Sequence, residues 1–210
     1  MRRGEEWLHR LRILEQRIAT STFTCDDGRG LVRVSVDGHG RVQAVELAPD
    51  WTQGIQVRDL ADTVRDAYRA ARRRASDFVA EKYAETGVSV LARSFLPAGA
   101  GALPPLLDRL APLVPRAGAV LAELGLETVV GTAADDRVLA EFDCFGELRG
   151  LVVSWRYALQ TPHDELAESI REALSAGEMR SAWRNAELSG RLARRPTLRS
   201  TVARGQADCA

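Results

Sequence analysis

The chain has 210 residues and carries 29 basic and 29 acidic side chains, so its formal net charge is zero. A neutral chain has no overall attraction to nucleic acid or to an anionic membrane, and any such binding must come from local charge. Its hydrophobic fraction of 45% is that of an ordinary globular protein. The charged first ten residues lack the apolar segment of a signal peptide, and the most apolar run, residues 110–126, is too short and too interrupted to span a bilayer.

The first fifty residues predict a helix followed by a β-hairpin. An apolar stripe recurs at helical spacing between residues 5 and 20, and a β-favouring stretch follows at residues 22–24. Residues 32–36 alternate apolar and polar side chains, as a half-buried strand does. An Asp37–Gly40 turn and a return strand over Val42–Leu47 complete the hairpin. The apolar alternation slips after Ala44, which predicts a bulge between Ala44 and Val45.

A long helix completes this first set of elements. A loop between Pro49 and Gly54 precedes it, and the helix itself is predicted from Gln56, with an apolar face that persists for roughly six turns. Gly87 is expected to end it. Residues 95–105 are rich in proline, glycine and alanine, which predicts a linker.

The chain repeats this pattern at a fixed offset of 106 residues. Residues 57–67 (VRDLADTVRDA) align with residues 163–173 (HDELAESIREA), and the apolar positions of the two hairpins coincide without a gap. Solenoid repeats are shorter, at roughly 20–50 residues. The repeat therefore indicates a duplicated small domain.

The second copy predicts the same order of elements. Its first helix is expected over residues 106–124, and its strands at Val129–Val130, Val138–Phe142 and Leu148–Tyr157. Thr161 and Pro162 are expected as the N-cap and first residue of its long helix. The chain then divides into a first copy (1–87), a linker (88–105), a second copy (106–188) and a disordered, arginine-rich tail (189–210).

One copy resembles a known family. The stretch GLVRVSVDG at residues 30–38, the apolar residues of the return strand and the two flanking helices are similar to the YbaB/EbfC family of bacterial nucleoid-associated proteins. The resemblance covers most of residues 5–105. In the second copy it survives mainly as hydrophobic pattern and as the helix Leu166–Leu174, because DRVLAEFDC replaces the glycine-flanked strand.

The resemblance implies an α+β fold made of two α-β-β-β-α units, each with a three-stranded antiparallel sheet packed on a long helix. Family members form tweezer-shaped homodimers that bind double-stranded DNA with low sequence specificity, and their terminal helices are held to contribute the contacts. Two copies in one chain then imply an intramolecular pseudo-dimer with a built-in partner. The family usually has asparagine after the aromatic residue of the long helix, where this chain has Arg69.

Residues that could carry catalysis or bind a metal are scattered along the chain. None of the three histidines shares a helical face with a cysteine or carboxylate at ligand spacing, and the three cysteines form no CxxC motif. Both Gly-x-Gly pairs lead into strands rather than into a helix N-terminus. We therefore expect no catalytic residue, metal or cofactor, and the cysteine usage favours a reducing cytoplasm.

Arginines at helical spacing carry the functional signal. Arginines that neutralise phosphates release counterions, which supports binding to nucleic acid without sequence readout. The expected partner is double-stranded DNA of the nucleoid. The expected contacts are Arg10, Arg17, Arg65, Arg69, Arg72, Arg73, Arg194 and Arg195.

The second copy favours an alternative. From Glu127 to Glu178 it has eleven acidic residues against four arginines, which predicts a clamp with one positive and one negative arm. A protein-interaction or secretion-system accessory adaptor that kept the fold without DNA binding would fit this charge, and some actinobacterial members of the family are associated with specialised secretion systems. Further homodimerisation of the fused pair is open, and no membrane partner is expected.

Overall fold

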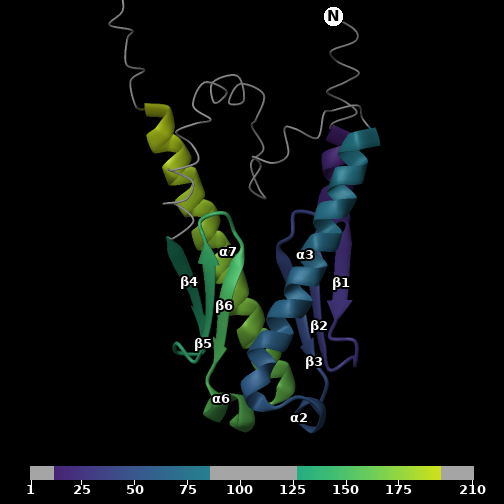
Figure 1. Ribbon diagram of the computed structural model, residues 1–210, viewed down its shortest axis with the longest axis vertical. Helices are drawn as coiled ribbons and strands as arrows, with labels where there is room; N and C mark the ends of the chain where they lie inside the picture. Colours follow the sequence, from purple (N-terminus) through teal and green to yellow (C-terminus); the bar gives the residue numbers. More distant parts are fainter. Residues whose placement is uncertain (1–11, 86–126, 195–210) are drawn as a thin grey trace, which may run out of the picture.

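The computed structural model describes residues 12–85 and 127–194, which form two units of the same architecture (Figure 1). In the first unit, residues 12–20 are helical and lead into β1 (Thr22–Asp26), β2 (Val32–Asp37) and β3 (Val42–Leu47). A short helix α2 (Trp51–Gly54) and a 3-10 turn η1 (Val57–Asp59) precede the long helix α3 (Leu60–Glu85). The second unit contains β4 (Thr128–Ala133), β5 (Val138–Asp143), β6 (Leu148–Val153), α6 (Trp155–Gln160) and α7 (His163–Arg194).

Each unit has an antiparallel three-stranded sheet, in the orders β1-β2-β3 and β4-β5-β6. The predicted α+β class is confirmed. Strands β2 and β3 map onto β5 and β6 residue for residue at the offset of 106, and the register shifts also coincide, at Ser35/Val36 and Glu141/Phe142. The two units are thus structural repeats of one another.

The structure corrects four local predictions. The bulge in β3 leaves Gln43 unpaired, one step before the predicted site, because Val36 pairs with Val42 and Ser35 with Ala44. Helix α2 replaces the predicted loop, with Trp51 buried as its anchor. The strand predicted to reach Tyr157 ends at Val153, and helix α6 follows it. Helix α7 begins at His163 rather than at the predicted Pro162, and the carbonyl of Pro162 accepts the first helical hydrogen bond.

Some predicted segments lie outside the described residues. They are residues 5–11 of the first helix, the helix predicted at 106–124, the linker and the tail beyond residue 194. Helix α7 runs to Arg194, so it includes six residues of the stretch that the sequence assigned to the tail. None of the helices in the described ranges is long and apolar enough to cross a membrane.

Each long helix packs on both sheets, so the two units interlock. Helix α3 covers β1 and β2 of its own sheet and also contacts β6, while α7 covers β4 and β5 and also packs on β3. The buried apolar residues accordingly form one continuous core that includes side chains from both units, such as Tyr68 and Phe142, whose rings meet edge to face. Neither unit could bury its own third strand without the other.

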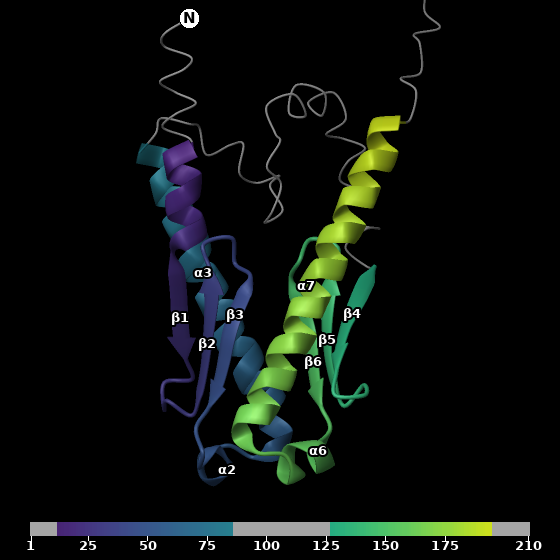
Figure 2. The same cartoon turned by 180° about the vertical axis from the view of Figure 1, so that it is seen from behind.

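Helices α3 and α7 lie close together near α2 and α6 and diverge toward their C-terminal ends, as the views from both sides show (Figures 1 and 2). We call the region around α2 and α6 the closed end, and the region where the C-terminal halves of α3 and α7 separate the open end. Residues 12–20 lie beside α3 at the open end.

Candidate nucleic-acid interface

Positive charge increases along both long helices toward the open end. Residues 60–68 of α3 hold two acids and one arginine, whereas residues 69–85 hold five bases and three acids, a formal +2. Residues 163–175 of α7 hold four acids and one arginine, a formal −3, whereas residues 176–194 hold four arginines and two glutamates, a formal +2. The acids of the second copy on this helix therefore gather toward the closed end, and its half at the open end is basic.

We call the C-terminal half of α3, together with the helix of residues 12–20, the first arm, and the C-terminal half of α7 the second arm. The first arm presents two of the predicted arginines to solvent at the open end. Arg17 and Arg73 are both exposed, and neither forms an ion pair among the described residues. The helix that carries Arg17 is fixed against the unit, because Leu14 and Ile18 are buried and the hydroxyl of Tyr83 donates to Glu15 at 2.7 Å. These two arginines are placed on rigid elements with their charge available to a ligand.

Two other predicted arginines contact the second unit instead. Arg69 donates from Nη2 to the carbonyl of Leu148 at 2.6 Å. Arg72 donates to the carbonyl of Gly146 in the β5–β6 turn and lies 3.5 Å from Glu147, with its guanidinium 5.7 Å from the Tyr68 ring centroid. Arg69 and Arg72 are thus part of the contact between the units.

The remaining predicted arginines are spread out. Arg65 is partly buried nearer the closed end and pairs with Asp62 at 2.8 Å. Arg194 is the last residue of α7, and Arg10 and Arg195 lie outside the described residues. The sequence missed Arg12 and Arg74, which are exposed on the same arm as Arg17, and Arg180 and Arg184 on the second arm. Arg74 donates to the carbonyl of Thr24, and Arg184 pairs with Glu127.

A partly buried carboxylate at the contact between the two units was also missed. Glu178 of α7 accepts a hydrogen bond from the Tyr68 hydroxyl at 2.7 Å and from the backbone N–H of Val42 at 3.1 Å, both in the first unit. Burial raises the pKa of Glu178 above its ordinary value, although these hydrogen bonds and the charge of Arg72 oppose the shift. Burial also raises the pKa of Tyr68 well above its ordinary value, followed by the charge of Glu178.

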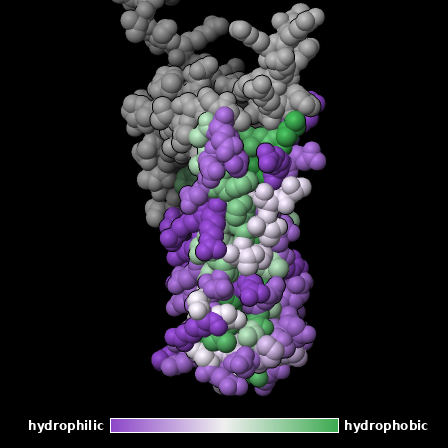
Figure 3. All heavy atoms as spheres, turned by 90° about the vertical axis from the view of Figure 1, so that its right-hand side faces the viewer, coloured by the Kyte–Doolittle hydropathy of each residue, from purple (hydrophilic) through white to green (hydrophobic). Residues whose placement is uncertain are grey.

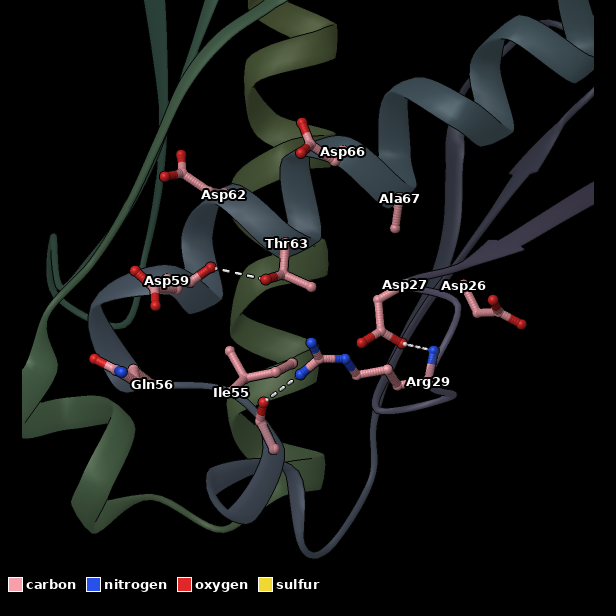
Figure 4. A pocket seen from close by; sticks show the side chains of 11 residues that line it. Asp26, Asp27, Arg29, Ile55, Gln56, Asp59, Asp62, Thr63, Asp66 and Ala67 are labelled. Atoms are coloured by element: carbon pink, nitrogen blue, oxygen red, sulfur yellow. Dashed lines mark hydrogen bonds between the residues drawn. The ribbon is translucent and has the colours of Figure 1, made fainter.

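An acidic pocket lies near the closed end of the first unit (Figure 4). Its carboxylates come from the end of β1, the β1–β2 loop, η1 and the first turns of α3. Asp27 accepts from the backbone N–H groups of Arg29 and Leu31, and Asp62 pairs with Arg65. These carboxylates are engaged within the protein, and among the described residues no group of three side chains is arranged to hold a metal ion.

Exposed apolar side chains distinguish the second unit from the first. The side of the molecule formed by the first unit is largely hydrophilic, with hydrophobic residues in a narrow band (Figure 3). Among the described residues, Ile13 is the only exposed large hydrophobic side chain of that unit. The second unit exposes Val130, Phe145, Val152, Trp155, Leu159, Met179 and Trp183.

The fold and charge define a class of protein in which two sheet-and-helix units pair through their long helices and spread two basic arms. Residues 1–88 match the profile of the YbaB/EbfC DNA-binding family. The nucleoid-associated protein CE0210 of Corynebacterium efficiens is 33% identical over 72 residues, which span 34% of this chain and 67% of the relative. No solved structure gives a significant match.

The chain belongs to the YbaB/EbfC DNA-binding family. Both matches support the resemblance inferred from the GLVRVSVDG strand, and the family match covers the first unit. The second unit adds a structural repeat that was recognisable in the sequence by its offset.

Proposed function

We propose that this protein binds double-stranded DNA, without catalysis and with low sequence specificity, between the open ends of α3 and α7 in the bacterial nucleoid of the cytoplasm. The observation that carries the proposal is the concentration of positive charge on both helices where they separate. The family of the chain and the nucleoid-associated relative support the same ligand.

The positions of the accessible charges support low specificity. Arginines on helix surfaces at the ends of two arms reach phosphates along a duplex, and phosphate contacts position a protein without reading bases. Arg17 and Arg73 are proposed as contacts on the first arm, because they are exposed and make no ion pair among the described residues. Arg10, Arg194 and Arg195, expected as contacts from the sequence, are proposed as further contacts.

Salt-dependent binding tests this proposal. Fluorescence anisotropy of a labelled random-sequence duplex should show binding at low salt, with log K falling linearly as log salt rises and a slope of about 0.9 for each phosphate contact. The Arg17→Ala/Arg73→Ala variant should bind more weakly, and its slope should be shallower by about 0.9 for each phosphate that the two arginines neutralise in the unaltered protein.

The control is Arg58→Ala, since Arg58 is exposed but lies in η1 near the closed end. Its affinity and slope should equal those of the unaltered protein. An absence of binding at low salt, or an equally weakened affinity in the control, would contradict the proposed site. Arg69 and Arg72 are left unchanged in this test, because their removal would also disturb the contact between the units.

The exposed apolar side chains of the second unit favour a second candidate function, a protein-interaction or secretion-system adaptor. Val152, Trp155 and Leu159 lie at the end of β6 and in α6, and Met179 and Trp183 are one turn apart on α7. Exposed apolar groups that gather on one part of a soluble protein are typical of contact sites for other proteins. Such a partner would bind the second unit only.

Site-specific photocrosslinking in cells tests the adaptor function. A photoreactive side chain at position 155 should give one protein adduct of defined mass if the α6 surface binds a partner. The matched control is position 49, because the offset of 106 places the exposed Pro49 of the first unit on Trp155. Equal adducts at both positions, or none, would argue against this function while leaving DNA binding to its own test.

A further inference from the structure

In the central turn of α3, the charged guanidinium of Arg72 contacts the second unit. Arg72 lies between the two hairpin turns. A Cβ atom on Gly40 in the first turn would lie 3.2 Å from its Nε atom, and the carbonyl of Gly146 in the second turn accepts its hydrogen bond. Glu147, the residue after Gly146, lies 3.5 Å from the guanidinium. The Arg72 side chain is only 17% exposed, so its charge is poorly screened by water.

The equivalent position of the second unit carries the opposite charge. An offset of 106 places Arg72 on Glu178, and Glu178 reaches the first unit as Arg72 reaches the second. It accepts a hydrogen bond from the backbone N–H of Val42, the residue directly after Arg41 in the first turn. Each long helix therefore contacts the hairpin of the other unit from the same position, one with an arginine and one with a glutamate.

The two hairpin turns also carry opposite charges at equivalent positions. The same offset places Arg41 on Glu147, so the first unit has arginine at both the helix and the turn position and the second unit has glutamate at both. Pairing of unlike units brings Arg72 to 3.5 Å from Glu147, and it places Glu178 on the backbone N–H of Val42, the residue after Arg41. Two first units paired in this geometry would instead face Arg72 with Arg41 twice, and two second units would face Glu178 with Glu147 twice.

We propose that Arg41, Arg72, Glu147 and Glu178 form a charge code that makes the pairing face of the first unit accept the acidic second unit and reject another copy of itself. Juxtaposed like charges disfavour wrong partners more than matched charges strengthen the right one. The code keeps the two units of one chain together and prevents exchange with like units of neighbouring chains.

Exchange between full-length variants tests the code. In Arg72→Glu the helix position and the turn position that faces it are both acidic, and in Glu147→Arg both are basic, so each chain is mismatched with itself. When the two variants are unfolded together and refolded, the altered first unit of one chain can pair with the altered second unit of the other through opposite charges, and the two unaltered units pair as in the original protein. Affinity-tagged R72E should then capture untagged E147R at least about tenfold more than tagged unaltered protein captures untagged unaltered protein.

Two controls keep the test decisive. The control pair Arg73→Glu and Met179→Arg places the same charges at exposed positions of α3 and α7 and should show no gain in capture. The double variant R72E/E147R restores unlike charges within one chain and should melt at a higher temperature than the less stable of the two single variants. No gain in capture over the unaltered protein, or a double exchange no more stable than that single variant, would overturn the proposal.

Discussion

At the scale of single residues, the two units pack their parts of the core similarly with different side chains. Phe142 of β5 is fully buried against Gly177 of α7, and a Cβ atom on that glycine would lie 2.4 Å from the ring. The equivalent residues of the first unit are Val36 and Ala71, both buried. The larger side chain in one unit thus accompanies the smaller one opposite it, which preserves the close packing of a protein interior.

Gly177→Ala should therefore destabilise the protein. Overpacking typically costs about 1–3 kcal/mol, and we expect this cost to exceed the roughly 1 kcal/mol of helix propensity that alanine gains over glycine. Urea unfolding measures the change. The double variant Phe142→Val/Gly177→Ala reproduces the pair of the first unit, so its destabilisation should be smaller than the sum of the two single effects, and additive effects would contradict this account.

Glu178 should give the stability a dependence on pH that glutamine removes. Because burial raises the pKa of Glu178 in the folded state, the folded protein holds this proton to higher pH than the unfolded chain does. Its contribution is present below the ordinary glutamate pKa of 4.5 and is lost as pH rises through the raised pKa. The free energy of unfolding of the unaltered protein, minus that of Glu178→Gln, should fall as the pH rises above the ordinary glutamate pKa of 4.5.

The difference between the two proteins isolates Glu178 from other carboxylates, including Asp37, whose charge also raises its pKa. Glutamine can still accept the hydrogen bonds from Tyr68 and Val42. A difference that rises with pH over this range would contradict the assignment.

At the scale of one element, α3 divides its arginines between two tasks. Arg69 and Arg72 contact the second unit, whereas Arg73 faces solvent. Arg69→Ala should lower the free energy of unfolding by about 1–2 kcal/mol, because it removes a partly buried charged hydrogen bond. Arg73→Ala should change it by less than about 0.5 kcal/mol and instead weaken DNA binding. Urea unfolding and duplex titration of both variants check the division, and equal destabilisation by the two would contradict it.

The sequence predicted the strands and the core of α3 closely, because alternating valines and a helical apolar stripe leave few other arrangements. It failed at Trp155 and Tyr157, whose β propensity extended the predicted strand into α6. Tertiary contacts decide there, since the buried Tyr157 hydroxyl hydrogen-bonds to Ser169 of α7.

The candidate site was predictable only in part. Spacing identified a basic face on α3, but which of its arginines turn toward the second unit depends on how α3 crosses β6, and no local pattern encodes that contact. The second copy is acidic overall, as its count of acidic residues indicated. That count did not distinguish residues near the closed end from residues of the second arm. The repeat offset did hold one further signal, the inversion from Arg72 to Glu178.

At the scale of the whole molecule, the interlocked helices should make the two units unfold together. Since α7 covers β3 and α3 covers β6, separating the units exposes apolar surface in both. Differential scanning calorimetry should therefore show one transition, with a calorimetric enthalpy close to the van't Hoff enthalpy. Two resolved transitions would indicate that the shared core contributes little to either unit.

The repeat also breaks a symmetry that a homodimer of one such unit would keep. Two identical arms are interchangeable, so rotating a homodimer by half a turn changes nothing for what lies between them. Here the same rotation exchanges an arm bearing Arg73 and Asp77 for one bearing Met179 and Trp183. A long ligand held across both arms is thus held with a direction, and successive chains along it can all point the same way.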